Sequence, residues 1–205
     1  MDLVLIGPGR IGTALLPLLQ AEGHTVTIRS RRVYGDFFSR DFAPERVAET
    51  LPACDAVLLL AGLFELNGSA ERMGLANHAA PVWIAECLHE KFPKAHVITF
   101  LDARVNRLPE ALPQNIQGYV EGKRRLRDWT LKAARAWGQE SGARVNGSAP
   151  GPILPPPSAD HREKGGVCLT PRPTIEDVHR AVEFLLRTAS VTGQILYVAA
   201  GQQLL

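Results

Sequence analysis

The chain has 205 residues, of which 45% are hydrophobic and 21% charged, and its formal net charge is +2. These proportions are typical of a globular protein with enough chain for one large domain. So small a net charge argues against a nucleic-acid-binding or polybasic membrane surface. Cys54, Cys87 and Cys168 lack any CxxC spacing, which favours a reducing compartment. No signal peptide precedes the first apolar run and no run is long enough to cross a bilayer, so we expect a cytoplasmic protein without membrane partners.

Strand and helix patterns alternate along the chain. We expect strands at residues 2–6, 25–29, 56–62, 95–102, 143–150 and 193–201. We expect helices at residues 13–23, 44–52, 71–92, 118–141 and 174–187, the last opened by a capping pattern of Thr174 and Asp177. Strands that are apolar on both faces and alternate with helices are typical of a parallel sheet covered on both sides. The sequence therefore predicts an α/β fold with a doubly wound, Rossmann-like parallel sheet in a single domain over residues 1–205.

A glycine-rich turn joins the first strand to the first helix. Gly7, Gly9 and Gly12 form GxGxxG, with Arg10 and Ile11 between the last two glycines. Such a turn brings the backbone close to a pyrophosphate and directs free N–H groups of the helix start toward it. We interpret it as a dinucleotide-binding turn; the alternative is a glycine turn without a ligand.

Basic residues follow the second strand, where an acidic residue would hold the ribose 2′-hydroxyl of NAD. The chain has Arg29, Ser30, Arg31 and Arg32 there. Guanidinium groups give forked, charge-assisted hydrogen bonds to phosphate, so the cluster favours the 2′-phosphate of NADP. The alternative is a solvated basic strand end.

Tyr119 and Lys123 are four residues apart at the start of the helix after the fourth strand, so their side chains share one helix face. An ammonium group beside a phenol favours the phenolate and lowers the pKa of the tyrosine. The phenol can then give a proton to a substrate while NADPH supplies the hydride, and Lys123 can also hold the nicotinamide ribose. Asp102 ends the fourth strand, at the same edge of the sheet, and is a candidate to orient substrate or a relay water. The alternatives are surface residues and a strand-end turn.

Several motifs together resemble the short-chain dehydrogenases/reductases over nearly the whole chain. They are LLAG (59–62), ANHAAP (76–81), YxxxK (119–123), RVNGSAPGPI (144–153) and VTGQILYVAAG (191–201). The resemblance implies a catalytic role for Tyr119 and Lys123. It also makes Asn77 a catalytic candidate; the alternative is an asparagine that caps or bridges helix backbone groups through water. It also implies cofactor contacts from the glycine turn, Arg29 to Arg32 and Lys123, and from Ala61, Gly62, Pro150 and Gly151. Homodimers or homotetramers are implied as well.

Within that family the chain is most similar to the pteridine reductase and dihydromonapterin reductase branch. The similarity rests on the Arg10-Ile11-Gly12 turn, on Asp102 in place of a serine, and on Phe64 after LLAG. It implies substrate contacts from Phe64 and Pro152 and a substrate loop around residues 152–166. The alternative for Phe64, which lies in an apolar run, is a core residue.

The chain also departs from the family pattern. LLAG lacks both asparagines of the family's NNAG, and Asp102 lies 17 residues before Tyr119 rather than about 13. Residues 33–42 leave room for little more than a short strand, with Asp41 as the counterpart of an adenine-contacting aspartate.

We therefore predict an NADPH-dependent reductase of a small carbonyl or imine substrate, with pterins among the candidates. The main alternative is an NADP(H)-binding protein without turnover. The N-terminal stretch is also similar to F420-dependent NADP oxidoreductases, although the later motifs are not. The histidines show no metal-ligand spacing, and no metal or nucleic-acid partner is expected.

Overall fold

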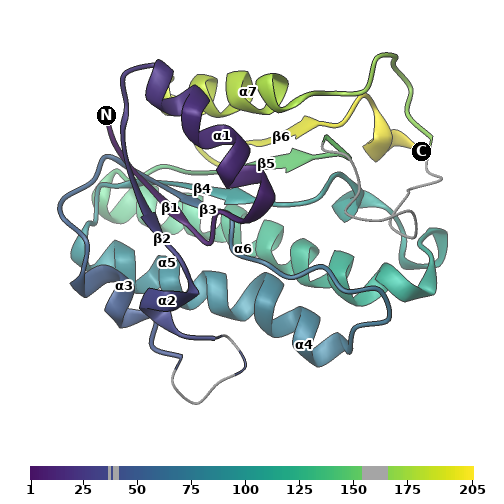
Figure 1. Ribbon diagram of the computed structural model, residues 1–205, viewed down its shortest axis with the longest axis horizontal. Coiled ribbons are helices and arrows are strands. Elements are labelled where there is room, and N and C mark those ends of the chain that lie inside the picture. The colour runs from purple at the N-terminus through teal and green to yellow at the C-terminus, as the bar shows by residue number, and fades with distance from the viewer. Residues whose placement is uncertain (37, 39–41, 154–165) are drawn as a thin grey trace.

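A single sheet of six parallel strands organises the molecule (Figure 1). The structure is a computed structural model that describes residues 1–36, 38, 42–153 and 166–205. The strands are β1 (Asp2–Ile6), β2 (Thr25–Arg29), β3 (Ala56–Leu59), β4 (His96–Phe100), β5 (Val145–Pro150) and β6 (Ile195–Val198). Their order across the sheet is β2-β1-β3-β4-β5-β6, and every neighbouring pair is parallel. The predicted fold class is confirmed.

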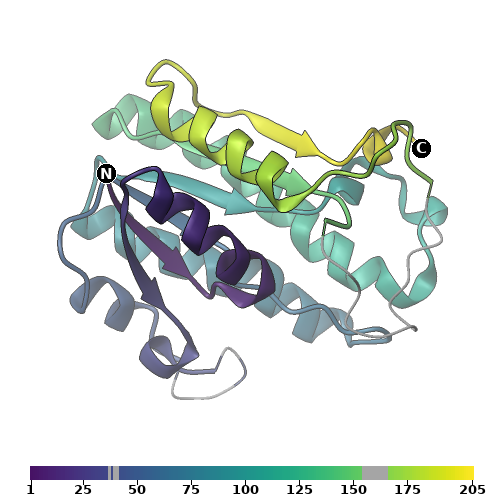
Figure 2. The ribbon, with the colours of Figure 1, turned by 45° about the horizontal axis from the view of Figure 1, so that its top comes forward.

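Helices cover both faces of this sheet. On one face, α1 (Gly9–Ala21) and α7 (Ile175–Arg187) lie side by side (Figures 1 and 2). The other face carries α3 (Glu45–Glu49), α4 (Ala70–Gly74), α5 (Ala80–Lys91) and α6 (Gln117–Ser141). The predicted capping box opens α7: Asp177 accepts from the backbone N–H of Thr174 at 2.8 Å. No helix in the described part of the chain is long and apolar enough to cross a membrane.

The central strands supply the core on both faces because successive strand side chains point in opposite directions. In β1, Val4 and Ile6 pack into the cluster under α5 and α6, while Leu3 and Leu5 pack into the cluster under α1 and α7. The strand β3 alternates in the same way. Strands buried on both faces are held in register, and this fixes which residues leave their carboxyl ends.

The helix predicted over residues 71–92 contains a π-helical turn, η1 (Leu75–Ala79), between α4 and α5. Pro81 lies at the start of α5, and proline has no N–H to donate to the preceding turn. Insertions of this kind recur at functional sites because they redirect one turn of the helix. Here the wide turn contains Asn77, whose side chain is fully buried.

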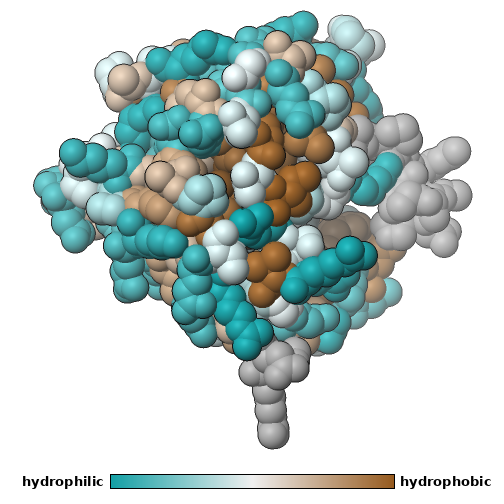
Figure 3. All heavy atoms as spheres, turned by 60° about the vertical axis from the view of Figure 1, so that its left-hand side comes forward, coloured by the Kyte–Doolittle hydropathy of each residue, from teal (hydrophilic) through white to brown (hydrophobic). Residues whose placement is uncertain are grey.

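The segment after β2 begins with a four-residue helix, α2 (Arg31–Tyr34). It overlaps the first two of residues 33–42, which we expected to leave room for little more than a short strand. The side chain of Tyr34 is 1% exposed and meets Phe42 edge-on, with 6.4 Å between ring centroids. In the described part of the chain, no strand pairs with the outer side of β2. Ile28 on this edge strand is 39% exposed, and the face turned forward in Figure 3 carries a group of hydrophobic residues among hydrophilic ones. Asp41 lies outside the described residues.

Candidate active site

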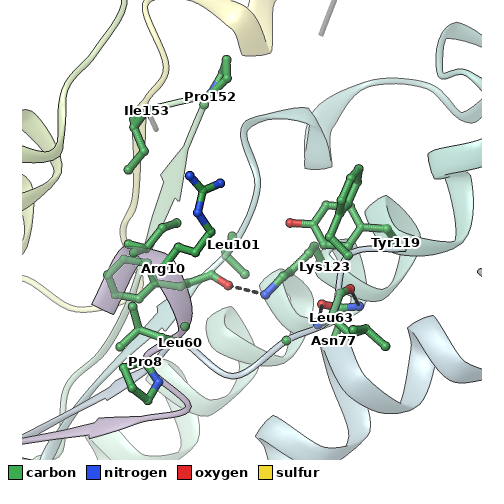
Figure 4. Close-up of a pocket in the computed structure, with 16 residues that line it drawn as sticks. Pro8, Arg10, Leu60, Leu63, Asn77, Leu101, Tyr119, Lys123, Pro152 and Ile153 are labelled. Carbon is green, nitrogen blue, oxygen red and sulfur yellow. Dashed lines mark hydrogen bonds between the residues drawn. The ribbon is translucent and has the colours of Figure 1, made fainter. Parts of the chain in front are cut away.

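A cavity of about 410 Å³ opens at the carboxyl ends of the strands (Figure 4). It lies beside the point where the chain crosses from β2 back over β1 to β3, and this switch point is where open α/β sheets bind ligands. Its walls come from the segments that follow β1, β3, β4 and β5 and from the start of α6. The lining residues are Pro8, Gly9, Arg10, Ile11, Leu60, Gly62, Leu63, Phe64, Asn77, Phe100, Leu101, Tyr119, Lys123, Gly151, Pro152 and Ile153.

The glycine turn has the backbone geometry that dinucleotide binding needs. Gly7 has φ of +60°, and a Cβ atom there would lie 2.7 Å from Cα of Ala61, so β1 and β3 can approach only without a side chain. Gly9 has φ of +52° and begins α1 with open space where a Cβ would lie. The first amide N–H groups of a helix lack intrahelical acceptors, so this open side is suited to an anion. Gly12 is buried in the first turn of α1, and Arg10 and Ile11 line the cavity.

Tyr119 and Lys123 both reach the cavity, as predicted (Figure 4). The hydroxyl group of Tyr119 points into the cavity rather than away from it. Lys123 is 5% exposed, and its Nζ donates to the carbonyl oxygen of Phe100 at 2.8 Å. Burial lowers the pKa of Lys123 to about 8, while the charge of Asp102 opposes that shift. A phenol and a buried ammonium on one wall can transfer a proton to a bound substrate.

Asn77 lines the cavity but its amide group is engaged with the backbone. Its Nδ2 donates to the carbonyl oxygens of Leu63, at 2.7 Å, and Met73, at 3.1 Å. Its Oδ1 accepts from the N–H of Leu63 at 3.1 Å. These bonds tie the segment after β3 to the π-helical turn. Asn77 therefore positions the cavity wall, and a direct chemical role for its amide is not supported by this geometry.

Asp102 differs from the expectation of a substrate-facing carboxylate. Its two oxygens accept from Nε and Nη2 of Arg104, both at 2.8 Å, and Oδ1 also accepts from the backbone N–H of Arg104. Burial by itself would raise the pKa of Asp102, but the hydrogen bonds and charge of Arg104, with the charge of Lys123, lower it overall. Asp102 is not one of the cavity-lining residues. The turn into the 3₁₀ helix η2 (Ala103–Asn106) thus directs the carboxylate to Arg104.

Phe64 lies over Tyr119 at the cavity wall. The two rings meet edge-on with 4.9 Å between centroids, and Phe64 is 39% exposed. Pro152 lines the cavity from the end of β5, so both predicted substrate-contacting residues border it. Most of the predicted substrate loop, residues 154–165, lies outside the described residues.

The basic residues after β2 have different surroundings. Arg29 donates from Nη2 to the carbonyl oxygen of Thr50 at 2.7 Å and from Nη1 to that of Ile28 at 3.1 Å. Its guanidinium is therefore occupied at the end of α3, in contrast to the predicted phosphate contact. The hydroxyl of Ser30 caps α2 by accepting from the N–H of Arg32. Arg31 and Arg32 are exposed, and Arg31 lies 3.7 Å from the carboxylate of Asp36.

The remaining predicted cofactor residues lie at strand ends. Gly151 lines the cavity after β5, whereas Pro150 ends that strand and Ala61 is buried against Gly7; neither of these two is a lining residue. Gly62 lines the cavity, and a Cβ atom there would lie 2.8 Å from Oδ1 of Asn77.

Sequence reasoning missed part of the site. The apolar walls from Leu60, Leu63, Leu101 and Ile153 were not predicted, although each lies within three residues of a predicted strand or motif end. Arg104 was missed as well, and its place two residues after Asp102 was the available signal. Among the described residues, no three His, Cys, Asp or Glu side chains gather into a metal-binding group.

Comparison with known sequences is limited to a short segment. No family model matches the chain. Over 61 residues, 30% of this chain, it is 48% identical to the human Epimerase family protein SDR39U1 and 46% identical to that of Bos taurus. The aligned segment is 20% of the length of each relative, so the chain matches only about a fifth of these curated proteins.

Solved structures match across the full chain. The 3-alpha-hydroxysteroid dehydrogenase of a Pseudomonas species, complexed with NADH, has a TM-score of 0.83 at 18% identity and covers 98% of this chain and 96% of its own. A small-chain dehydrogenase in complex with NADPH gives 0.80 at 18%, covering 100% and 99%. FolM Alternative dihydrofolate reductase 1 from Brucella canis, complexed with NADP, gives 0.76 at 22%, covering 100% and 94%. The chain has the fold of the short-chain dehydrogenases/reductases, which confirms the resemblance at the level of the fold.

Proposed function

We propose that the chain is an NADPH-dependent oxidoreductase of the short-chain dehydrogenase/reductase type that reduces a small carbonyl or imine substrate. The observation that carries the proposal is the joint approach of the Tyr119 hydroxyl and the Lys123 ammonium to a cavity whose opposite wall is the glycine turn (Figure 4). A dinucleotide on that turn would extend along the carboxyl ends of the strands toward this pair.

The chain's residues fit such a cofactor. The open N–H groups at the start of α1 suit the pyrophosphate, and Lys123 suits the nicotinamide ribose. Of the predicted 2′-phosphate contacts, Arg31 and Arg32 are the exposed guanidiniums at the end of β2. That two structural relatives were crystallised with NADPH and NADP supports the choice of a phosphorylated dinucleotide.

When bound, the reduced nicotinamide supplies the hydride. Tyr119 gives the proton to the substrate oxygen or nitrogen, so that one hydride and one proton complete the reduction. The ammonium of Lys123 stabilises the phenolate that remains until solvent returns a proton. The apolar walls from Leu63, Leu101 and Ile153 exclude water from the reacting atoms.

Substrate size and shape follow from the same walls. A cavity of about 410 Å³ that also receives the nicotinamide leaves room for a compact substrate. Phe64 offers an apolar surface at the rim, where a planar ring could stack. The likeness to the FolM reductase supports pterins as substrates to test alongside ketones and quinones.

The test is cofactor binding followed by turnover. We expect NADPH to quench the intrinsic fluorescence of the protein at lower concentration than NADH does, and we expect NADPH oxidation with at least one dihydropterin, quinone or ketone. Tyr119→Phe should retain NADPH binding and lose at least a hundredfold in turnover. Tyr197→Phe, which removes a hydroxyl from the half-buried tyrosine of β6, is the matched control.

Two outcomes would contradict the proposed function. Binding of NADPH without turnover on any of these substrates would favour the binding-protein alternative, which is motivated by the shortened segment after the second strand and by the loss of the NNAG asparagines. Equal turnover by Tyr119→Phe and wild type would exclude the proposed mechanism.

Location and assembly are also proposals. We infer a cytoplasmic protein from the isolated cysteines, and a homodimer or homotetramer from the exposed apolar residues Trp83 on α5 and Leu131 on α6, which are 45% and 43% exposed. Light scattering coupled to gel filtration tests the assembly, since a monomer at all concentrations would contradict it.

A further inference from the structure

Arg104 is a buried charge to which the proposed reaction assigns no role. It lies in η2 and is 8% exposed. Its guanidinium holds both oxygens of Asp102 in a fork, and its backbone N–H binds the same carboxylate. Fork geometry of this kind fixes the orientation of both side chains. Removing one partner of such a buried pair leaves an uncompensated charge, whereas removing both does not.

This pair borders the proposed proton donor. Cζ of Arg104 lies 5.9 Å from the centre of the Tyr119 ring. Asp102 also influences Lys123, since the charge of each shifts the pKa of the other. Asp102 is thus an anion that is paired with Arg104 and also feels the charge of Lys123. Among the described residues, the charged groups around Tyr119 are Lys123 and Glu121 on its own helix, Arg10 at the cavity wall, Asp102 at the N-cap of η2 and Arg104 within η2. Glu121 is itself paired with Arg124 and Arg125.

We propose that Arg104 is a positioning residue that sequesters the Asp102 carboxylate, so that Lys123 remains available to Tyr119 and Asp102 carries no proton in the reaction. Without Arg104, the cation that still acts on the buried carboxylate is Lys123. The ammonium would then move from the Phe100 carbonyl oxygen to Asp102. Its charge would be neutralised by the carboxylate and would no longer favour the phenolate of Tyr119. The catalytic part of this inference rests on the proposed function, but the electrostatic part does not.

The electrostatic part can be measured without a substrate. Ionisation of Tyr119 is followed by ultraviolet difference absorbance, with the Tyr119→Phe form of each variant subtracted. The chain has three tyrosines, and burial raises the pKa of Tyr34 to about 12 and also raises that of Tyr197. Subtraction of the Tyr119→Phe form of each variant removes the contribution of these two tyrosines, so that the ionisation of Tyr119 remains.

The three variants are Arg104→Met, Asp102→Asn and the double variant. We expect Arg104→Met to raise the ionisation midpoint of Tyr119 by about one pH unit. Asp102→Asn should not raise it, because it removes the anion. The double variant should return the midpoint close to that of wild type. An unchanged midpoint in Arg104→Met, or a double variant that shifts as far as Arg104→Met, overturns the proposal.

Stability is followed separately, since a merely structural pair would lower the melting temperature of Arg104→Met and leave the tyrosine midpoint in place. If Arg104→Met does not fold, Arg104→Lys takes its place, because it keeps a charge but loses the fork. With a reductase substrate in hand, the alkaline limb of the pH profile of kcat/KM should move with the midpoint, because Tyr119 must be protonated to give its proton to the substrate. If the ionisation midpoint of Tyr119 moves as expected but the protein turns over no substrate, the electrostatic inference stands and the reductase function is rejected.

Discussion

The ammonium group of Lys123 lies against Gly62, beside the position where any other residue would carry its Cβ atom. A Cβ atom on Gly62 would lie 3.0 Å from Nζ of Lys123 and 2.8 Å from Oδ1 of Asn77. Both neighbours are fixed, Lys123 by Phe100 and Asn77 by Leu63 and Met73. The glycine of LLAG is therefore needed because the lysine approaches the backbone at the end of β3.

Substitution of this glycine tests the close approach. We expect Gly62→Ala to displace the ammonium of Lys123, to lower kcat/KM at least tenfold and to destabilise the fold by about 1–3 kcal/mol. Gly74→Ala is the matched control, because a Cβ atom there meets nothing within 4 Å at the end of α4. Alanine is the better helix former, so the control should be as stable as wild type or more stable. Equal behaviour of the two variants in urea unfolding and turnover would contradict this reading of Gly62.

Lys123 should support turnover at a cost in stability. Burial lowers its pKa from 10.5 to about 8. Between these values the unfolded chain binds a proton that the folded protein does not, so stability rises with pH across this window. Below it, the buried charge destabilises the fold. We expect Lys123→Met to be more stable than wild type at pH 7 by about 1–3 kcal/mol and to lose nearly all turnover.

The same pKa predicts the alkaline limb of the activity. The ammonium form of Lys123 predominates only below pH about 8, so kcat should fall as the pH rises through that value. Urea unfolding of wild type and Lys123→Met at pH 7 and again above the ordinary lysine pKa should show the stability gap closing. A gap that is independent of pH would mean that Lys123 is not the group responsible.

His96 should account for part of the loss of folding stability at acidic pH. Its side chain is 3% exposed, Nδ2 of Asn146 lies 2.9 Å from its Nε2, and burial, aided by the charge of Arg144, lowers its pKa to about 3. As the pH falls from about 6.5 toward 3, the unfolded chain gains a proton that the folded protein excludes, so stability is lost. We expect His96→Gln to reduce this loss of unfolding free energy by roughly 3–5 kcal/mol, as measured in denaturant titrations at both pH values. His78→Gln, at a half-buried position, should change it less.

The arginines after β2 should separate into structural and cofactor-binding groups. Arg29→Ala removes the donor to the Thr50 carbonyl oxygen and should cost about 1 kcal/mol of stability while leaving the preference for NADPH over NADH intact. Replacing Arg31 and Arg32 together by alanine should reduce that preference roughly tenfold with little change in stability. Fluorescence titration of each variant with NADPH and NADH measures this preference. If Arg29→Ala alone removed the preference, Arg29 would be the cofactor-binding residue and this prediction would be wrong.

The sequence by itself determined the architecture. The alternation of buried strands with helices is visible in the local period of apolar residues. A strand that is buried on both faces is a continuous apolar run, whatever its place in the sheet. The glycine turn, the capping box at Thr174 and the Tyr119–Lys123 pair on one helix face are likewise set by neighbours within a few residues. For that reason they were predicted correctly.

Only the tertiary structure decided which partners the polar and charged side chains find. Asp102 and Arg29 were assigned to the site by their positions, but Asp102 pairs with Arg104 and Arg29 with the Thr50 carbonyl oxygen. Asn77 was a catalytic candidate with backbone bridging as the alternative, and it bonds the Leu63 backbone. The partners of Asn77 and Arg29 lie 14 and 21 residues away, and that of Asp102 depends on a turn whose shape packing sets. A buried polar group must form hydrogen bonds with groups that the fold brings close to it. The spacing of residues along the sequence does not tell which groups those are.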